Sequence, residues 1–313
     1  MLGVFLTECA LGCEVEPVGL PSHTRERVIA AAHLEAVEAG SLPNDGRPLS
    51  GAQLAAAGDG EGSVIVVELE ADGRSFTRRF ERLTLLDDVQ ALVARLSASG
   101  AIAKGLYRFA LVNLPEPAAH ADGLQLPPFP RALPPLPVVS LRDAGVTEPP
   151  RCAHPSIFLL RERALRLLAH ARATPEVEVG ALLLVTPFLI AEALPARLGL
   201  YVTDIVPLGE GTSGDAIQLR VPPAALAAIP EDPARGRHHG GLAHSHPVSA
   251  GTAHFLSADD RALATSFYHR PHQIQMVVDP READPRHALA AFAWVGGRLA
   301  RVCFRLLDEP RRH

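Results

Sequence analysis

Two histidines separated by one residue, in His244-Ser245-His246-Pro247, are the side chains of this sequence best placed to do chemistry. Side chains two positions apart on a β-strand point to the same face, so the two imidazoles are presented together. Paired imidazoles are typical first ligands of a zinc ion. Because the chain contains 14 histidines, such a pair also arises by chance. A metal site therefore needs further ligands.

A third ligand is expected from Ser257-x-x-Asp260, at the start of a helix predicted over 258–267. Residues three apart share a helix face, so Ser257 and Asp260 face the same cleft. Two histidines and one aspartate leave a fourth position open, which is the catalytic arrangement rather than the structural one. The Ser-x-x-Asp pattern is also typical of a capping box, and the two interpretations are compatible. His254 and Asp259 are alternative ligands.

A zinc hydrolase also needs a group that takes up and returns a proton. Glu178 is the candidate, because a lone carboxylate in the apolar strand predicted over 177–185 has no evident packing role. The alternative is an exposed charge on an edge strand. The remaining histidine pairs are assigned to loops and turns: His238 with His239, and His269 with His272.

The elements that must position these residues alternate through the second half of the chain. Apolar periodicity and turn residues predict strands and helices in succession. The strands are expected over 156–160, 177–185, 200–207, 216–221, 241–246, 274–278, 288–295 and 299–306, and the helices over 162–173, 223–229 and 258–267. This order predicts a mixed α/β domain over 153–313.

The first half predicts a smaller α+β domain over 1–113. Strands are expected over 63–70, 75–81 and 106–112, a helix over 85–97, and Ala-rich helical structure over 24–59. This order is compatible with a ubiquitin-like or other partner-binding fold. Residues 114–152 are rich in proline, which favours an extended linker; a segment that docks on a domain or partner is the alternative.

Composition limits the classes of function. With 313 residues, 47% hydrophobic and 21% charged residues, the chain is long enough for two globular domains. A net charge of -5 without a basic stretch disfavours nucleic-acid partners. No apolar run approaches the ~20 residues of a membrane span. The start lacks the basic region of a signal peptide, and four scattered cysteines make no disulfide framework, so we expect a cytoplasmic protein.

The combined pieces resemble the JAMM (MPN+) metalloprotease family, in particular its bacterial deubiquitinase-like members. Glu178-Val179-Gly180-Ala181-Leu182-Leu183 is similar to the family's Glu-x-Gly-Gly-x-Leu. The downstream match consists of His244-Ser245-His246-Pro247 and Phe255-Leu256-Ser257-Ala258-Asp259-Asp260. The resemblance covers roughly residues 153–310 and implies a JAMM-like mixed sheet flanked by helices.

The resemblance implies a role for each residue. His244, His246 and Asp260 would bind Zn²⁺, Glu178 would act as general base and then as acid, and Ser257 would help hold the oxyanion. The implied reaction is hydrolysis of an isopeptide or peptide bond after the C-terminus of a ubiquitin-like protein. That protein or its conjugates, and E1- or E2-like enzymes, are the expected partners, in a bacterial conjugation or antiphage-defence pathway. The alternatives are a catalytically silent MPN scaffold and a DNA-associated protein similar to RadC.

Two departures from the family pattern remove no ligand. Ten residues, Pro247–Leu256, separate the second histidine from Ser257, where the family usually has seven. A short loop insertion costs little free energy. Ala181 replaces the second glycine of the upstream motif. We therefore expect an active enzyme.

Overall fold

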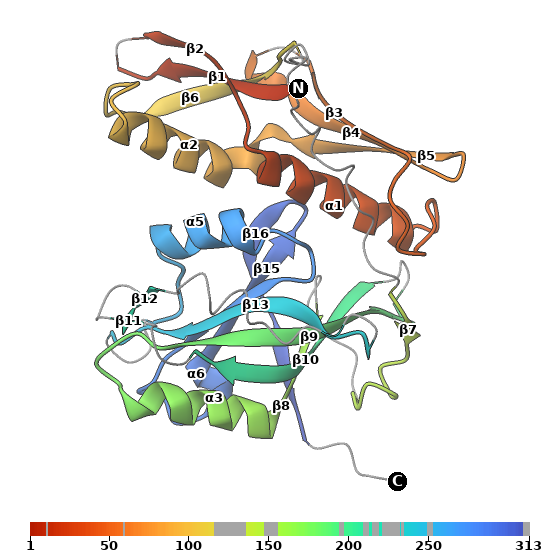
Figure 1. The fold of residues 1–313 in the computed structure, drawn as a ribbon, viewed down its shortest axis with the longest axis vertical. Coiled ribbons are helices and arrows are strands. Elements are labelled where there is room, and N and C mark those ends of the chain that lie inside the picture. Colours follow the sequence, from red (N-terminus) through yellow and green to blue (C-terminus); the bar gives the residue numbers. More distant parts are fainter. Residues whose placement is uncertain are drawn as a thin grey trace. The chain divides into compact units, whose positions relative to one another are not determined.

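The computed structural model describes residues 1–10, 12–58, 60–115, 136–146, 156–193, 197–208, 213–214, 219–220, 232, 235–248 and 253–308. The chain forms two compact units (Figure 1). The first comprises Met1–Pro135, Thr265–Arg270 and Gly296–Arg298, and the second Leu136–Ala264, Pro271–Val295 and Leu299–His313. Both units combine sheets with helices, which confirms the mixed α/β class.

The first unit contains two antiparallel three-stranded sheets, ordered β2-β1-β6 and β3-β4-β5, and two long helices. Its elements are β1 (Leu2–Glu8), β2 (Glu14–Gly19), α1 (Ser22–Glu38), β3 (Gly51–Ala57), η1 (Gly60–Gly62), β4 (Val64–Ala71), β5 (Arg74–Glu81), η2 (Arg82–Leu85), α2 (Leu86–Ala98) and β6 (Tyr107–Asn113). The side chain of Asn113 links the two sheets: its amide accepts from Ala56 N at 2.8 Å and donates to Ala56 O at 2.9 Å.

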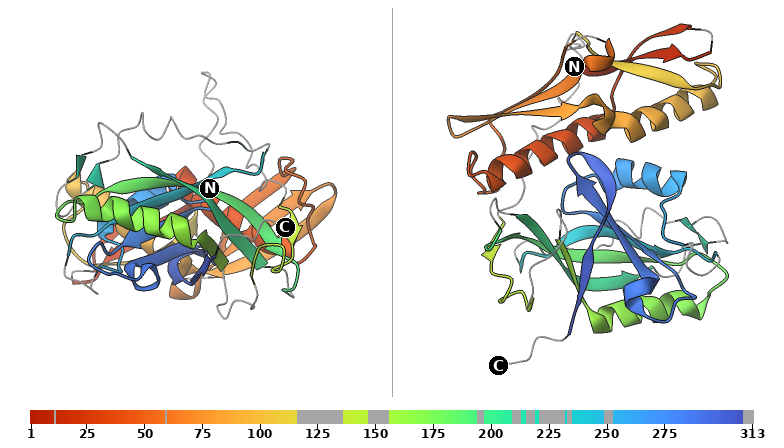
Figure 2. Two further views of the ribbon diagram at one scale, coloured as in Figure 1. Left: turned by 90° about the horizontal axis from the view of Figure 1, so that it is seen from below. Right: turned by 180° about the vertical axis from the view of Figure 1, so that it is seen from behind.

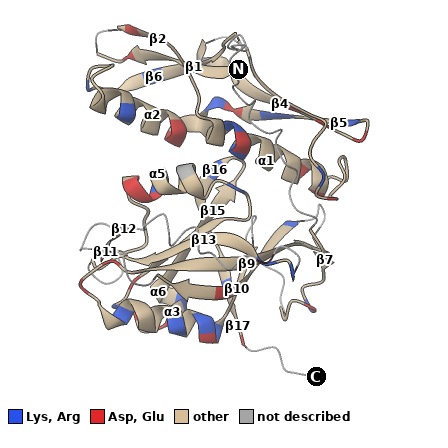
Figure 3. Cartoon of the chain, viewed as in Figure 1, with Lys and Arg blue, Asp and Glu red and all other residues tan. Residues whose placement is uncertain are grey.

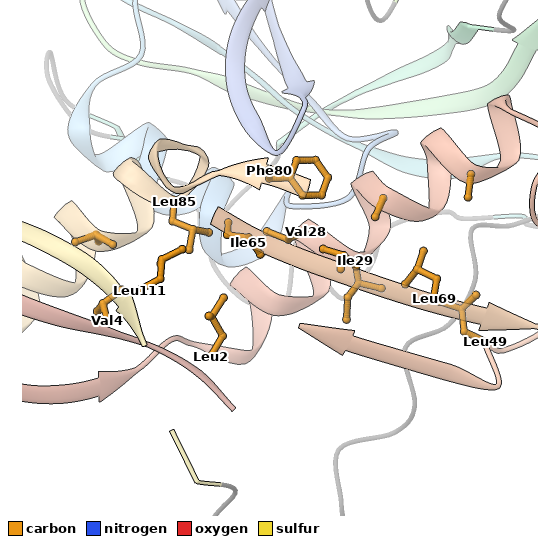
Figure 4. Packing of buried hydrophobic residues seen from close by; sticks show 14 of the residues in the cluster. Leu2, Val4, Val28, Ile29, Leu49, Ile65, Leu69, Phe80, Leu85 and Leu111 are labelled. Atoms are coloured by element: carbon orange, nitrogen blue, oxygen red, sulfur yellow. The ribbon is translucent and has the colours of Figure 1, made fainter. Parts of the chain in front are cut away.

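The core of this unit joins the helices to both sheets. Val4, Val28, Ile65 and Leu85 belong to one buried apolar cluster that draws on β1, α1, β4 and η2 (Figure 4). In β4 the buried and less buried residues alternate, because successive side chains of a strand point to opposite faces. The sequence predicted this strand and its partner β5 to within one residue.

The turn between β4 and β5 follows from its two central residues. Asp72 and Gly73 both have positive φ, 49° and 73°, as a type I′ hairpin requires. The helical prediction over 24–59 is correct for α1 but wrong for 51–57, which is strand β3. The alanines of β3 favour a helix locally, but pairing with β4 along the whole strand overrides that propensity. Strand β1 was also not foreseen.

The second unit is built around one large mixed sheet (Figure 2). Its elements are β7 (Val138–Val139), β8 (Ser156–Leu160), α3 (Arg161–Ala173), β9 (Gly180–Ile190), β10 (Arg197–Pro207), β11 (Ser213–Gly214), β12 (Leu219–Arg220), β13 (His238–Ser245), α5 (Ala258–Phe267), β14 (Ile274–Val278), α6 (Pro285–Ala288), β15 (Leu289–Val295), β16 (Arg298–Val302) and β17 (Phe304–Leu307).

The strand order of this sheet is β16-β15-β14-β13-β9-β10-β8-β17, with β7 added beside β9. Strand β13 runs antiparallel to β9 and parallel to β14. Nearly every residue of β9 and every residue of β14 is buried, which explains why their sequences are continuous apolar runs rather than alternating ones. The central pair β9–β13 carries the candidate site.

Residues 136–146, at the end of the proline-rich segment, belong to the second unit. Val138 and Val139 pair with β9, and Leu141 and Val146 join a buried cluster with Phe158. Several expectations differ in detail from the structure. Strand β10 begins at residue 197 rather than 200, and β13 spans 238–245 rather than 241–246, so His238 and His239 lie in a strand instead of the predicted loop. The strand predicted over 177–185 begins at residue 180, and the one over 299–306 is divided at residue 303 into β16 and β17.

Two predicted elements fall wholly or largely on residues that the structure does not describe. The helix predicted over 223–229 and most of the strand over 216–221 lie outside the described residues. Among the described helices, none combines the length and apolar character needed to cross a membrane. Cys9 and Cys13 are free and exposed, whereas Cys303 is disulfide-bonded, which the scattered cysteines did not suggest. Disulfides are rare in cytosolic proteins, so a cytoplasmic location stays a prediction.

Candidate metal centre

The two histidines meet at the end of β13. His244 lies opposite Gly180 of β9 and Val277 of β14, and the main-chain N–H of His246 donates to Val278 O at 3.0 Å just beyond the strand. Both side chains are buried, at 1% and 3% exposure. Their Nε2 atoms are 3.0 Å apart. The alternation of a strand therefore brings the imidazoles together, as the spacing predicted.

Asp260 approaches the histidines from the first turn of α5, whose start is acidic (Figure 3). The N–H and hydroxyl of Ser257 both donate to Asp260 Oδ2 at 2.8 Å, and Asp260 N donates back to Ser257 Oγ at 3.1 Å. This reciprocal pattern is the predicted capping box. It turns the carboxylate over the helix start, where Oδ1 lies 3.0 Å from His244 Nε2 and Oδ2 lies 3.5 Å from His246 Nε2.

His244, His246 and Asp260 form a group that could hold a metal ion, since one ligand atom from each lies within 4.8 Å of the others. No other such group occurs among the described residues. His246 Nδ1 is 2.9 Å from Ala253 O. A carbonyl oxygen can only accept, so this bond places a proton on Nδ1. While the ring is protonated its Nε2 donates to Asp260, and the neutral ring offers the Nε2 lone pair to a metal.

The charges of the group reinforce one another. Burial acts to raise the pKa of Asp260, but hydrogen bonds from His244, His246 and Ser257 outweigh it and hold that pKa well below its usual range. Burial acts to lower the pKa of His246, and the hydrogen bond and charge of Asp260 outweigh it and raise that pKa. The aspartate is therefore ionised and available as an anionic ligand.

Glu178 lies beside this group but outside it. Its side chain is 8% exposed, and Oε1 is 4.0 Å from His246 Nε2. The residue stands before β9 rather than within it, because the strand begins at Gly180. The sequence argument from a charge inside an apolar strand was therefore wrong about the element. The position of the carboxylate next to the histidines is nevertheless compatible with proton transfer.

Ser245, the residue between the two histidines, fixes the segment that carries Glu178. Its Oγ accepts from Val179 N at 3.0 Å and lies 3.5 Å from Val177 O, and its own N–H donates to Val179 O at 2.9 Å. The peptide groups on both sides of Glu178 are thus tied to β13. From the sequence alone, Ser245 had no expected role beyond separating the two histidines. Its place inside the His-x-His motif was the signal that could have found it.

The alternative candidates take no part in the group. Asp259 is exposed and His254 is half-buried, and neither belongs to the metal-binding set. His238 lies at the start of β13, with its ring 5.6 Å from that of His272. Phe255 packs against a candidate ligand: it is 47% exposed, and the centre of its ring lies 4.6 Å from that of the His246 ring.

No protein-family model and no curated protein matches the chain. Among solved structures, the chain is similar to the solution structure of protein DSY2949 from Desulfitobacterium hafniense, at 22% sequence identity and a TM-score of 0.35. The match covers 50% of this chain and 97% of the other. The functional proposal therefore rests on the geometry of the site.

Proposed function

We propose that this protein is a zinc-dependent isopeptidase or peptidase of the JAMM type, which cleaves after the C-terminus of a ubiquitin-like protein. The observation that carries the proposal is the grouping of His244, His246 and Asp260 within 4.8 Å, with the Glu178 carboxylate 4.0 Å from His246. These residues come from three separate segments and match the family's order of strand end, helix start and upstream glutamate.

Zinc suits the donor set. Zinc bonds to imidazole nitrogen and carboxylate oxygen measure about 2.0–2.2 Å, so in a tetrahedral site neighbouring ligand atoms lie about 3.3 Å apart. His244 Nε2 lies 3.0 Å from His246 Nε2 and 3.0 Å from Asp260 Oδ1, both close to that value, whereas the carboxylate oxygen 3.5 Å from His246 Nε2 is the other one, Oδ2. Three protein ligands leave a fourth position open, as in catalytic sites.

The chain's own residues divide the work of hydrolysis. When bound, Zn²⁺ supplies Lewis-acid polarisation of a carbonyl and makes water more acidic. Glu178 takes up the proton of the attacking water on its carboxylate and returns it to the leaving amine. Ser257 donates its hydroxyl to Asp260 Oδ2 at 2.8 Å and so orients a ligand. Its hydroxyl must turn away from Asp260 to support the oxyanion directly.

The two small residues of the upstream motif differ in their surroundings. A Cβ added to Gly180 would come within 2.6 Å of Leu219 Cδ2 and 2.8 Å of Leu208 Cδ1, so a larger residue there requires these two side-chain ends to move. Ala181 is fully buried between Ala243 and Pro207 of the neighbouring strands, where its methyl group is accommodated. The substitution of the second glycine therefore removes no catalytic group.

The pathway and partners follow from the resemblance and are part of the proposal. We expect precursor processing or deconjugation of a ubiquitin-like protein in a bacterial conjugation or antiphage-defence system, with E1- or E2-like enzymes as further partners. The first unit would recruit one of these proteins. Cytoplasmic location, and the absence of nucleic-acid and membrane partners, remain predictions from composition.

The test is incubation of the zinc-loaded full chain with fusions of candidate ubiquitin-like proteins, followed by mass spectrometry of the products. Cleavage directly after the ubiquitin-like C-terminus is expected for the natural protein and not for Glu178→Ala. Absence of cleavage of every cognate fusion, or equal cleavage by Glu178→Ala, would overturn the assignment. Stoichiometric zinc that disappears in His244→Ala/His246→Ala, without any cleavage, would favour the scaffold alternative.

A further inference from the structure

A second concave site lies in the second unit, apart from the metal centre. Its volume is about 1300 Å³, and its described lining includes four arginines and two aspartates. The arginines come from the turn after β7, from α6 and from β16 and β17; they are Arg142, Arg286, Arg301 and Arg305. None of the metal-site residues lines this cavity.

The charge of this lining is unbalanced. Asp308 accepts from Arg161 Nε at 2.9 Å, so a guanidinium outside the cavity already offsets its charge. The side chains of Arg142, Arg286 and Arg301 are exposed and form no ion pair within the described part of the chain. The chain as a whole carries a net charge of -5. The arginines therefore make this cavity positively charged in a protein whose net charge is negative.

Both the size and the apolar surface of the cavity bear on the kind of ligand. Small-molecule clefts usually measure about 300–1,000 Å³, and this cavity is larger. Val302, Phe304 and Leu306 are half-buried and also line the cavity, so part of its surface is apolar. A lone phosphate gains nothing from such surface. The N-terminus of α6 is not free to bind a phosphate either, because the Asp284 carboxylate already accepts a hydrogen bond from Arg286 N there.

We propose that this cavity binds an acidic, partly apolar peptide segment of a partner protein. Guanidinium groups bind carboxylates through paired, charge-assisted hydrogen bonds, and the walls of a concave site strengthen the attraction. The half-buried apolar residues of the lining accommodate the aliphatic side chains of the same segment. The site is independent of the metal centre, so it stands or falls separately from the proposed isopeptidase activity.

Fluorescence anisotropy with the full chain tests the proposal. The probe is a labelled peptide of alternating glutamate and leucine, and its control has glutamine in place of glutamate. Buffers contain no reductant, so that the disulfide of Cys303, which also lines the cavity, is kept. The test variant is Arg142→Gln/Arg286→Gln/Arg301→Gln. The matched control removes three exposed cations of the first unit: Arg74→Gln/Arg79→Gln/Lys104→Gln.

The glutamate peptide is expected to bind the natural protein and the matched control equally, and the test variant about tenfold or more weakly. Affinity falls as salt rises, because exposed charges are screened. Asp143→Asn, which removes a carboxylate from the lining, is expected to tighten binding about twofold to fivefold. Equal binding to test and control variants, equal binding of the glutamine peptide, or binding of inorganic pyrophosphate in place of the peptide would overturn the proposal.

Discussion

Asp259 and Asp260 follow each other in the first turn of α5 and provide a matched pair of perturbations. Asp259 is exposed, whereas Asp260 lies 3.0 Å from His244 Nε2 and accepts two hydrogen bonds from Ser257. Asn at either position removes one negative charge from a helix N-terminus, which costs about 0.3–1 kcal/mol. Only Asp260→Asn also removes a ligand of the candidate metal.

The size of the difference follows from linkage between metal binding and folding. At a zinc concentration 100 times Kd, binding stabilises the folded state by about 2.7 kcal/mol. Loss of an outer-shell partner weakens metal binding about 10–100-fold, so loss of a direct ligand is expected to cost at least about 100-fold. The same zinc concentration then stabilises Asp260→Asn by only about 0.4 kcal/mol.

Calorimetry with and without zinc measures this difference as a shift in melting temperature. For a unit of this size, 1 kcal/mol corresponds to about 2–4 °C. Zinc is therefore expected to raise the melting temperature of the second unit by roughly 5–11 °C in the natural protein and in Asp259→Asn. In Asp260→Asn the rise is about 1–2 °C. A full rise in Asp260→Asn, or its loss in Asp259→Asn, would refute the assigned ligand set.

Three further predictions follow from neighbouring residues. Glu178→Gln is expected to keep zinc, measured by elemental analysis, but to lower the cleavage rate about 10²–10⁴-fold, since it removes a proton acceptor; an unchanged rate would exclude that role. Ser245→Ala leaves Val179 N–H without its acceptor and is expected to destabilise by about 1 kcal/mol in urea unfolding, and an unchanged unfolding midpoint would contradict that role. Burial lowers the pKa of His33 in α1, so the unfolded chain takes up the proton first as pH falls below about 6.5. Each such group lowers the stability of its unit there by up to about 1.4 kcal/mol per pH unit. Burial also lowers the pKa of His23 and of His269 in the first unit, so His33→Gln should reduce the slope without abolishing it.

Most elements of the second unit could be predicted because their local patterns are strong. Strands β8 and β14 and helix α5 have the predicted bounds, since each is an uninterrupted apolar or amphipathic run closed by a turn or a cap. The first unit shows where local patterns fail. Strand β3 consists largely of alanine, the best helix former, and becomes a strand only because β4 pairs with it along its whole length.

The sequence by itself determined the donor types of the site and two local geometries. The spacing in His244-Ser245-His246 puts two imidazoles on one face of a strand, and Ser257-x-x-Asp260 makes a capping box; both depend only on residues close in the chain. Tertiary structure decided which of these distant segments come into contact. Glu178 reaches the histidines because β13 pairs with β9 in the register that sets His244 opposite Gly180. Ser245 can bond to Val179 only in that register, across 66 residues of chain. Strand periodicity does not specify the partner or the register, so the contacts of Ser245 and the distance of Glu178 from the histidines required the fold.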